Sequence, residues 1–266
     1  MKFGTISYAH ILFILATVSS TALAGLPMET ESARLPAKGT YQAETAFEYQ
    51  TSREGTEAAL PMEFETGLTD QFALLVEPVP FTTIQPRNKP HATGIGDLEL
   101  TLFYLSLTES ERRPAIALAA EVKFPTAKSR LIGTGKADYT PYVIGSKKFG
   151  LFDVHINFGY TFMGQPNGQT VNDLFNYALG IEYEVGHQWE LIAEVYGNTS
   201  SLSGRETEGE HPGIANSAVT PESAGNEVVG TVGARYLYTK STIFSFGISY
   251  DNNDALLLRP GITVVF

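Results

Sequence analysis

Glutamates at alternate positions are the residues of this chain whose spacing could support chemistry. Two pairs, Glu63 with Glu65 and Glu182 with Glu184, are each separated by a single residue. In an extended strand both members of a pair project from one face about 6–7 Å apart, and two carboxylates at that separation can hold a cation. Isolated pairs of glutamates of this kind are usually solvated, so by themselves they predict only an acidic strand face.

Other residue types give little support for catalysis, metal binding or a cofactor. A Ser–His mechanism needs a nucleophile within hydrogen-bond reach of its base, and no serine stands at a matching spacing from His155 and Asn157. The five histidines are scattered without metal-ligand spacing, and cysteine is absent, so we expect no metal site and no disulfide. The run Gly94–Asp97 lacks the third glycine of a nucleotide fingerprint. An enzyme, with Asp138 and His155 in its site, is therefore the least favoured hypothesis.

The first 24 residues are typical of a secretory signal peptide. Lys2 supplies a positive charge, Tyr8 to Val18 form a short apolar core, and Ala22 and Ala24 give the small-residue pattern of a cleavage site. The apolar core is well short of the ~20 residues that a membrane-spanning helix needs. We therefore expect export of the chain and cleavage after Ala24.

The mature chain is acidic and rich in residues that favour strands. Without Lys2 it keeps 17 of the 18 basic residues against 29 acidic ones, a formal net charge of −12. This balance argues against nucleic acid as a partner, because phosphate binding needs clustered Lys and Arg, and it favours cations over anions. The 13 Tyr, 16 Phe and 25 Gly residues suit strands and turns better than packed helices.

Segments of about ten residues that alternate apolar and polar side chains recur along the mature chain. Between Ala115 and Phe124, Leu118 falls on one face while Glu121 and Lys123 fall on the other, because successive strand side chains point to opposite faces. The pattern predicts twelve strands, at residues 40–50, 59–68, 71–80, 95–106, 114–124, 137–148, 151–162, 174–185, 188–198, 226–237, 241–250 and 255–266.

The connectors between these segments alternate in length. One set is tight or moderately short, and the other set is mostly longer, with predicted loops at Thr51 to Ala58, Phe81 to Gly94, Pro125 to Lys136, Met163 to Asp173 and Thr199 to Gly225. Short turns at one end and long loops at the other are what bacterial outer-membrane barrels show. The sequence therefore predicts an all-β fold, a closed antiparallel transmembrane β-barrel of about 12 strands over residues 39–266. The extension 25–38 could be a periplasmic tail or a plug.

A soluble antiparallel sandwich would also alternate apolar and polar residues. Export, the even strand count and bulky aromatic residues on the predicted outer faces favour the membrane barrel instead. The last segment ends on Phe266, which resembles the C-terminal signal read by the outer-membrane barrel-insertion machinery, an expected partner. Pro141 and Pro260 fall inside predicted strands, where a missing N–H interrupts the ladder, so a bulge or strand end must accommodate each.

Four stretches resemble a known family of outer-membrane transporters, the MetA-pathway-of-phenol-degradation family. They are Gly67 to Phe72, Gly94 to Leu100, Leu118 to Ala127 and Gly133 to Pro166. The resemblance runs from about Gly39 to Phe266. It implies a β-barrel in the outer membrane of a Gram-negative bacterium, and it supplies no residue of known role in binding a substrate.

In a membrane barrel the polar strand faces must line the interior, because charges on the lipid side are costly. We expect this lining to be mostly acidic with few basic groups. The candidate lumen-lining residues are Glu44, Glu48, Glu63, Glu65, Glu99, Glu121, Lys123, His155, Glu182, Glu184, Glu194, Arg235 and Arg259.

Two functions fit this interior. The first is a channel or transporter for passive passage of small molecules, hydrophobic or aromatic ones among them, through an acidic lumen in the outer membrane. The second is a barrel plugged by its own side chains, with Arg235 and Arg259 clasping neighbouring carboxylates, that serves a structural or surface-interaction role. Small barrels commonly fill with their own side chains, and for most of the charged groups this structural role is favoured.

Overall fold

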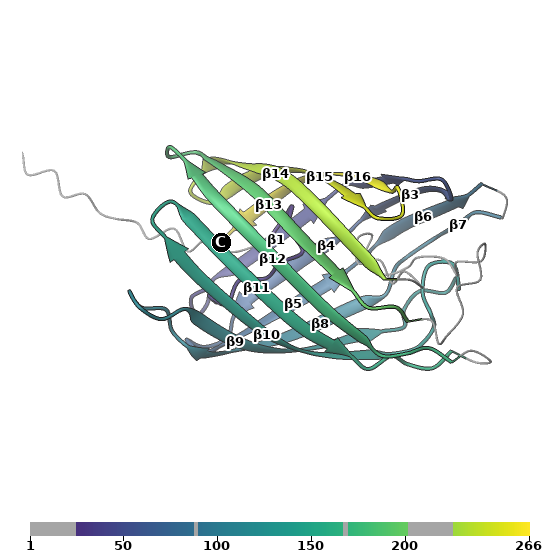
Figure 1. The fold of residues 1–266 in the computed structure, drawn as a ribbon, viewed down its shortest axis with the longest axis horizontal. Coiled ribbons are helices and arrows are strands. Elements are labelled where there is room, and N and C mark those ends of the chain that lie inside the picture. The colour runs from purple at the N-terminus through teal and green to yellow at the C-terminus, as the bar shows by residue number, and fades with distance from the viewer. Residues whose placement is uncertain (1–24, 88–89, 167–169, 202–225) are drawn as a thin grey trace, which may run out of the picture.

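The alternating segments fold as strands of one antiparallel sheet (Figure 1). This computed structural model describes residues 25–87, 90–166, 170–201 and 226–266, so the expected signal peptide lies outside the described residues. The strands are β1 (Tyr41–Ala46), β2 (Glu48–Thr51), β3 (Gly55–Leu60), β4 (Met62–Gly67), β5 (Phe72–Pro78), β6 (Phe81–Pro86), β7 (Ala92–Gly94), β8 (Leu98–Leu107), β9 (Ala115–Phe124), β10 (Asp138–Phe149), β11 (Phe152–Thr161), β12 (Leu174–Val185), β13 (Trp189–Asn198), β14 (Glu227–Thr239), β15 (Thr242–Asp251) and β16 (Leu256–Val265).

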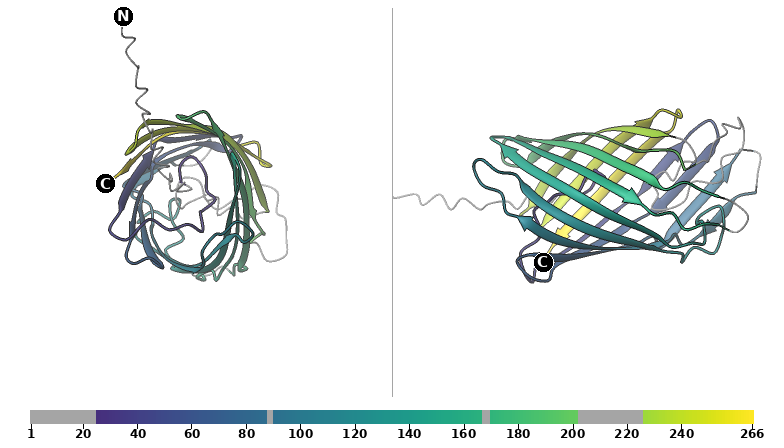
Figure 2. Two further views of the ribbon diagram at one scale, coloured as in Figure 1. Left: turned by 90° about the vertical axis from the view of Figure 1, so that its left-hand side faces the viewer. Right: turned by 60° about the horizontal axis from the view of Figure 1, so that its bottom comes forward.

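These segments make a closed barrel of twelve strands, as the sequence predicts. The first four barrel strands are each interrupted once, so that β1–β2, β3–β4, β5–β6 and β7–β8 are each the two halves of one strand. Strand β16 pairs antiparallel with both β1 and β2, which joins the last barrel strand to the first. The end-on view in Figure 2 shows the resulting ring.

The interruptions meet one another across neighbouring strands. Phe47, between β1 and β2, donates its N–H to the carbonyl of Pro260 at 2.9 Å, and Pro61, between β3 and β4, accepts the N–H of Ala46 at 3.4 Å. Because proline has no N–H to give to a ladder, β1 and β3 each stop near such a residue and resume beyond it. The missing N–H of Pro260 is therefore accommodated at the interruption between β1 and β2.

Pro141 is accommodated in a different way. It stays within β10 in register with Ala120 of β9. On the other side of β10, regular pairing with β11 begins only at Tyr142, beyond an isolated bridge between Tyr139 and Phe162. The missing N–H therefore falls in a gap of the β10–β11 ladder.

Two predicted loops are wrong in their extent. The region Thr51 to Ala58 is mostly strand, since β3 begins at Gly55, and the region Phe81 to Gly94 contains β6 and β7. The interruptions break the apolar–polar alternation, so the sequence pattern loses these strand halves. Strand β7 pairs with β6 and with no other described strand, and the residues after β9 pack beside it, where Ile132 contacts Ile84 and Ala92.

The outer face of the barrel is apolar and carries aromatic pairs near its short turns. Phe72 packs on Tyr104, Phe152 on Tyr183 and Trp189 on Tyr236, with ring centroids 5.1, 4.7 and 4.8 Å apart. Such an aromatic girdle is expected where a barrel wall meets the membrane surface. In the part of the chain that the structure describes, no helix is long and apolar enough to cross a bilayer.

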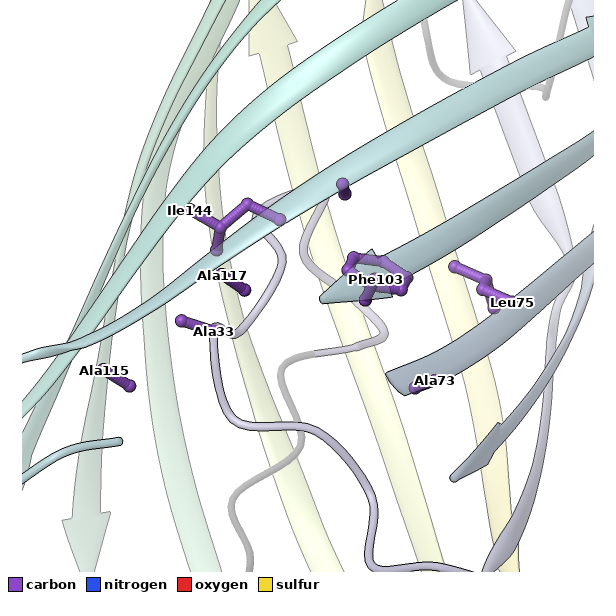
Figure 3. Close-up of a cluster of buried hydrophobic side chains, with 8 residues drawn as sticks. Ala33, Ala73, Leu75, Phe103, Ala115, Ala117 and Ile144 are labelled. Carbon is purple, nitrogen blue, oxygen red and sulfur yellow. The ribbon is translucent and has the colours of Figure 1, made fainter. Parts of the chain in front are cut away.

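The segment before the first strand lies inside the barrel. The end-on view in Figure 2 shows this N-terminal stretch, coloured purple, within the ring of strands. We call residues 25–38 the N-terminal plug. On one side it packs against apolar side chains of the wall: Ala33 joins a buried cluster that includes Leu75, Phe103 and Ala117 (Figure 3). Residues 25–38 therefore lie within the barrel in this structure and do not extend away from it.

The outward face gives a direct test of membrane embedding. Val143, at the middle of β10, is 49% exposed on that face. We expect Val143→Arg to lower the free energy of unfolding by about 2–4 kcal/mol, because arginine is costly near the bilayer midplane, whereas Phe149→Arg at the strand end should cost about 0–1 kcal/mol. Urea titration of the protein folded in lipid vesicles measures both. Equal costs at the two positions would argue against a bilayer around this wall.

Candidate functional site

The structure places the thirteen predicted lining residues on the inner faces of the strands. Eight are buried, namely Glu44, Glu48, Lys123, His155, Glu182, Glu194, Arg235 and Arg259. The other five, Glu63, Glu65, Glu99, Glu121 and Glu184, are partly exposed. Their contact with a passing solute stays a prediction. What the structure adds is that most of the buried ones contact the plug or its immediate partners.

Two arginines hold the plug backbone near its start. The Arg235 Nε–H donates to the carbonyl of Leu26 at 2.8 Å, and Arg259 Nη1 donates to the carbonyl of Pro27 at 3.1 Å. Each guanidinium therefore binds main-chain oxygens that the barrel interior would otherwise leave unpaired.

The same arginines are paired with carboxylates. Arg235 lies 2.7 Å from Glu182, and Arg259 lies 2.8 Å from Glu48 and also pairs with Glu29 of the plug. Buried charges are tolerated when they are paired and hydrogen-bonded. The pairing of the two arginines with neighbouring carboxylates, expected from the sequence, is thus present, and a carboxylate of the plug also takes part in it.

Acceptors on β13 and β11 bind the N–H groups of the plug. Both oxygens of Glu194 accept the Glu29 N–H, at 3.0 and 3.1 Å, and one of them accepts the Thr30 N–H at 2.6 Å. Asn157 accepts the Glu31 N–H at 2.6 Å and donates to the Glu31 carbonyl at 3.0 Å. Because Glu194 accepts N–H groups of two successive plug residues, it is a strong anchor for this part of the plug.

A glycine in the wall lets the plug approach closely. A Cβ atom at Gly247 would lie 2.7 Å from Pro27 Cβ and 3.1 Å from Pro27 Cγ. Any larger residue there would therefore overlap the proline ring. The wall of β15 is shaped for the plug in its observed position.

The far end of the plug is fixed by Arg34. Its two Nη atoms donate to Asp153 at 2.9 Å each, and its Nε donates to Glu109 at 2.7 Å. Glu109 also accepts bonds from the Lys147 ammonium at 2.8 Å and from the Lys148 N–H at 3.0 Å. Partial burial raises the pKa of Glu109, but the bonds from Lys147, Lys148 and Arg34 outweigh it and lower that pKa to about 2.

His155 has a hydrogen-bond partner that the sequence did not reveal. Its Nδ1 lies 2.8 Å from Ser146 Oγ, a contact that the spacing of the two residues in the sequence does not indicate. The two residues are nine positions apart but face each other across the β10–β11 ladder. Both are fully buried at 0–1% exposure, and Ser146 Oγ already accepts the Ala33 N–H of the plug at 2.8 Å. This environment keeps substrate away from the hydroxyl.

Space remains in the lumen beside the plug. A cavity of about 150 Å³ lies towards the long loops, between Lys123, Asp138, Tyr177 and Tyr196. A second, of about 100 Å³, lies deeper against the plug, and Glu99, Glu121 and Tyr142 line both. The two cavities therefore adjoin and lead from the loop end to the plug.

Several residues of this site are absent from the predicted lumen-lining residues, and for two of them the apolar–polar alternation could have indicated their position. Asp153 and Asn157 share the polar strand face of His155, and alternation alone places them inside. Arg34, Glu29 and Thr30 belong to a segment without alternation, so their sequence carries no signal of position. Only the folded chain brings them to Asp153 and Glu194.

The anchor at Glu109 predicts a pH dependence. Its pKa is lowered in the folded state, so the ionised carboxylate stabilises the fold above about pH 4.5, and this contribution is lost as the pH falls towards about 2. We expect the melting temperature of wild-type protein to drop more steeply over this interval than that of Glu109→Gln. Parallel slopes for the two proteins would show that the carboxylate does not anchor Arg34 and Lys147.

Comparisons with solved structures agree on the architecture. The COG4313 outer-membrane channel from Pseudomonas putida F1 superimposes with a TM-score of 0.62 at 12% identity, covering 87% of this chain and 97% of that one. The NanC porin gives 0.55 at 11% identity over 84% and 98%. The KdgM porin in complex with disordered oligogalacturonate gives 0.54 at 12% over 85% and 99%. No curated protein matches the chain significantly.

The family comparison covers most of the sequence. The family model described as "Putative MetA-pathway of phenol degradation" matches residues 24–256. The solved relatives are outer-membrane channels and porins, and the fold is the closed barrel they share. The chain therefore belongs to this family and is a porin-like β-barrel of the outer membrane.

Proposed function

We propose that the protein is a passive outer-membrane channel for small neutral and cationic molecules, hydrophobic and aromatic ones included. In this proposal the N-terminal plug closes the route and must shift for passage. The observation that carries it is the free space beside the plug. Two adjoining cavities make up that space, one towards the loop end and one against the plug that is lined by carboxylates.

The deeper cavity is strongly acidic. No lysine or arginine lines it among the described residues, and six carboxylates do: Glu29, Glu31, Glu63, Glu77, Glu99 and Glu121. A confined space lined by one sign of charge concentrates counter-ions and repels co-ions. Under this proposal the ionised fraction of these carboxylates favours cations in the lumen and disfavours anions.

The outer cavity suits a small aromatic ring. Its lining includes the side chains of Tyr142, Tyr177, Tyr196, Met163 and Leu174. An apolar cavity of about 150 Å³ can hold benzene, and the volume here is about 150 Å³. Aromatic and thioether groups contact a ring favourably, which supports small aromatic molecules as cargo.

The charge of the lumen separates this channel from one of its structural relatives. The KdgM porin is described with bound oligogalacturonate, a chain of negatively charged sugars. Here the wall beside the open space carries carboxylates, which repel such a polyanion. The shared barrel therefore does not imply a shared cargo.

A barrel closed permanently by its plug is the second candidate function. The many hydrogen bonds between the plug and Glu194, Asn157, Arg235 and Arg259 favour it. In that case the protein would serve a structural or surface-interaction role without conducting. The two candidates differ in whether displacing the plug opens a path.

Gly247→Ala displaces the plug without removing any anchor. The new methyl would overlap Pro27, and an overpacked contact must relax by movement. We expect single-channel conductance in planar bilayers to rise about twofold or more over wild type. Gly230→Ala is the matched control, because nothing lies within 4 Å of its added Cβ. If neither wild type nor Gly247→Ala conducts any ion, the channel proposal is wrong and the plugged barrel stands.

Neutralising the acidic wall tests the cation preference. The double change Glu63→Gln and Glu77→Gln removes two carboxylates that line the deeper cavity. We expect it to lower the cation-to-anion permeability ratio by about twofold or more, read from the reversal potential under a salt gradient. Glu111→Gln, at an exposed position in the turn between β8 and β9, should leave the ratio unchanged. An unchanged ratio in the double variant would refute a selective acidic lumen.

A further inference from the structure

We propose that Asp153, His155 and Glu182 form a binding site for a divalent transition-metal ion such as Zn²⁺, and that the plug residue Arg34 competes with the ion for this site. The site lies on neighbouring strands of the inner wall, β11 and β12, with Asp153 directly opposite Glu182 in the ladder. It is separate from the cavities of the proposed solute route, whose linings contain none of the three residues.

The donor atoms are already gathered. One ligand atom from each of Asp153, His155 and Glu182 lies within 4.8 Å of the other two, and all three side chains are buried. His155 Nε2 is 3.7 Å from Asp153 Oδ1 and 3.8 Å from Glu182 Oε1. Zinc bonds of about 2.0–2.1 Å in a tetrahedron place ligand atoms about 3.3 Å apart. To bind the ion, the two distances from His155 Nε2 would have to shorten by about half an ångström, and the two carboxylate oxygens, which lie within 4.8 Å of each other, would have to close to a similar separation.

His155 points an unused atom into this space. Its Nε2 is buried and has no hydrogen-bond partner among the described residues, and a buried polar atom without a partner is costly. Its other nitrogen, Nδ1, lies 2.8 Å from Ser146 Oγ. A metal-binding histidine usually donates its second ring N–H to an acceptor. Ser146 can accept that N–H, which leaves the Nε2 lone pair directed at the two carboxylates.

The charges around the site leave room for a divalent ion once the plug residue withdraws. The linked group holds four carboxylates, Glu109, Asp153, Glu182 and Glu190, and three cations, Arg34, Lys147 and Arg235. With His155 neutral, the sum is −1. Without Arg34 it becomes −2, which one divalent ion balances. In this structure the guanidinium of Arg34 therefore takes the place that the metal ion would have beside Asp153.

The donor set indicates which metals fit. One imidazole nitrogen and two carboxylate oxygens suit Zn²⁺ and similar transition metals, whereas Ca²⁺ and Mg²⁺ prefer oxygen ligands alone. Three protein ligands leave a fourth position for water. Because the ion and Arg34 share Asp153, metal binding and plug anchoring oppose each other, and each must weaken the other by the same factor.

Isothermal titration of the detergent-solubilised, tag-free barrel with Zn²⁺ tests the site. We expect Arg34→Gln to bind Zn²⁺ about tenfold or more tightly than wild type, because the competing cation is gone. His155→Gln in the Arg34→Gln background should lose that binding. His187→Gln, which removes an exposed histidine in the turn between β12 and β13, should retain it in the same background.

Folding of each variant is checked by its heat-modifiable electrophoretic mobility. A second measurement stands even if His155→Gln does not fold: X-ray absorption of Zn²⁺-loaded Arg34→Gln should show one imidazole and oxygen ligands. The proposal is overturned if Arg34→Gln binds no Zn²⁺, if binding survives the loss of His155, or if the bound ion has no imidazole ligand. Equal affinity in wild type and Arg34→Gln overturns the competition.

Discussion

The pairing of buried guanidinium groups with carboxylates and plug carbonyls is the interaction on which the interior depends. A barrel with an apolar outer face must turn its charges inward, and a narrow lumen cannot hydrate them all. Arg235 and Arg259 each lie beside wall carboxylates and also bind main-chain oxygens of residues 25–27. The plug thus provides carbonyl acceptors for arginine N–H groups that the wall alone would leave unpaired. The wall in turn provides hydrogen-bond partners for a stretch of backbone that forms no strand.

This dependence explains which parts of the fold the sequence could predict. Alternation is a local property, so twelve strands and their inner faces follow from it. The strand halves β3, β6 and β7 adjoin interruptions of the barrel strands, where the alternation is lost, so the sequence pattern places them in part or whole in loops. The plug has no periodicity, and its position follows from long-range contacts alone, such as that of Leu26 with Arg235.

The candidate site shows the same division between local and long-range information. The placement of His155 on an inner face could be predicted from its own strand. Its neighbours could not, because Ser146 and Glu182 come from the strands on either side and their meeting depends on register. A shift of register by one residue moves every side chain of a strand to the other face. A cluster built across three strands is therefore invisible to spacing rules that look for ligands along one strand.

The two sides of the plug differ in kind, and this difference bears on how a route could open. Towards β10, β11, β13, β14 and β16 the plug is held by ion pairs and hydrogen bonds. Towards β5, β8 and β9 it meets small apolar side chains such as Ala73 and Ala117, and the open cavity lies on that side too. Apolar contacts are non-directional, whereas each polar anchor requires a particular geometry. A plug that keeps its polar anchors and tilts away from the apolar wall widens a passage lined by carboxylates without unpairing the buried arginines.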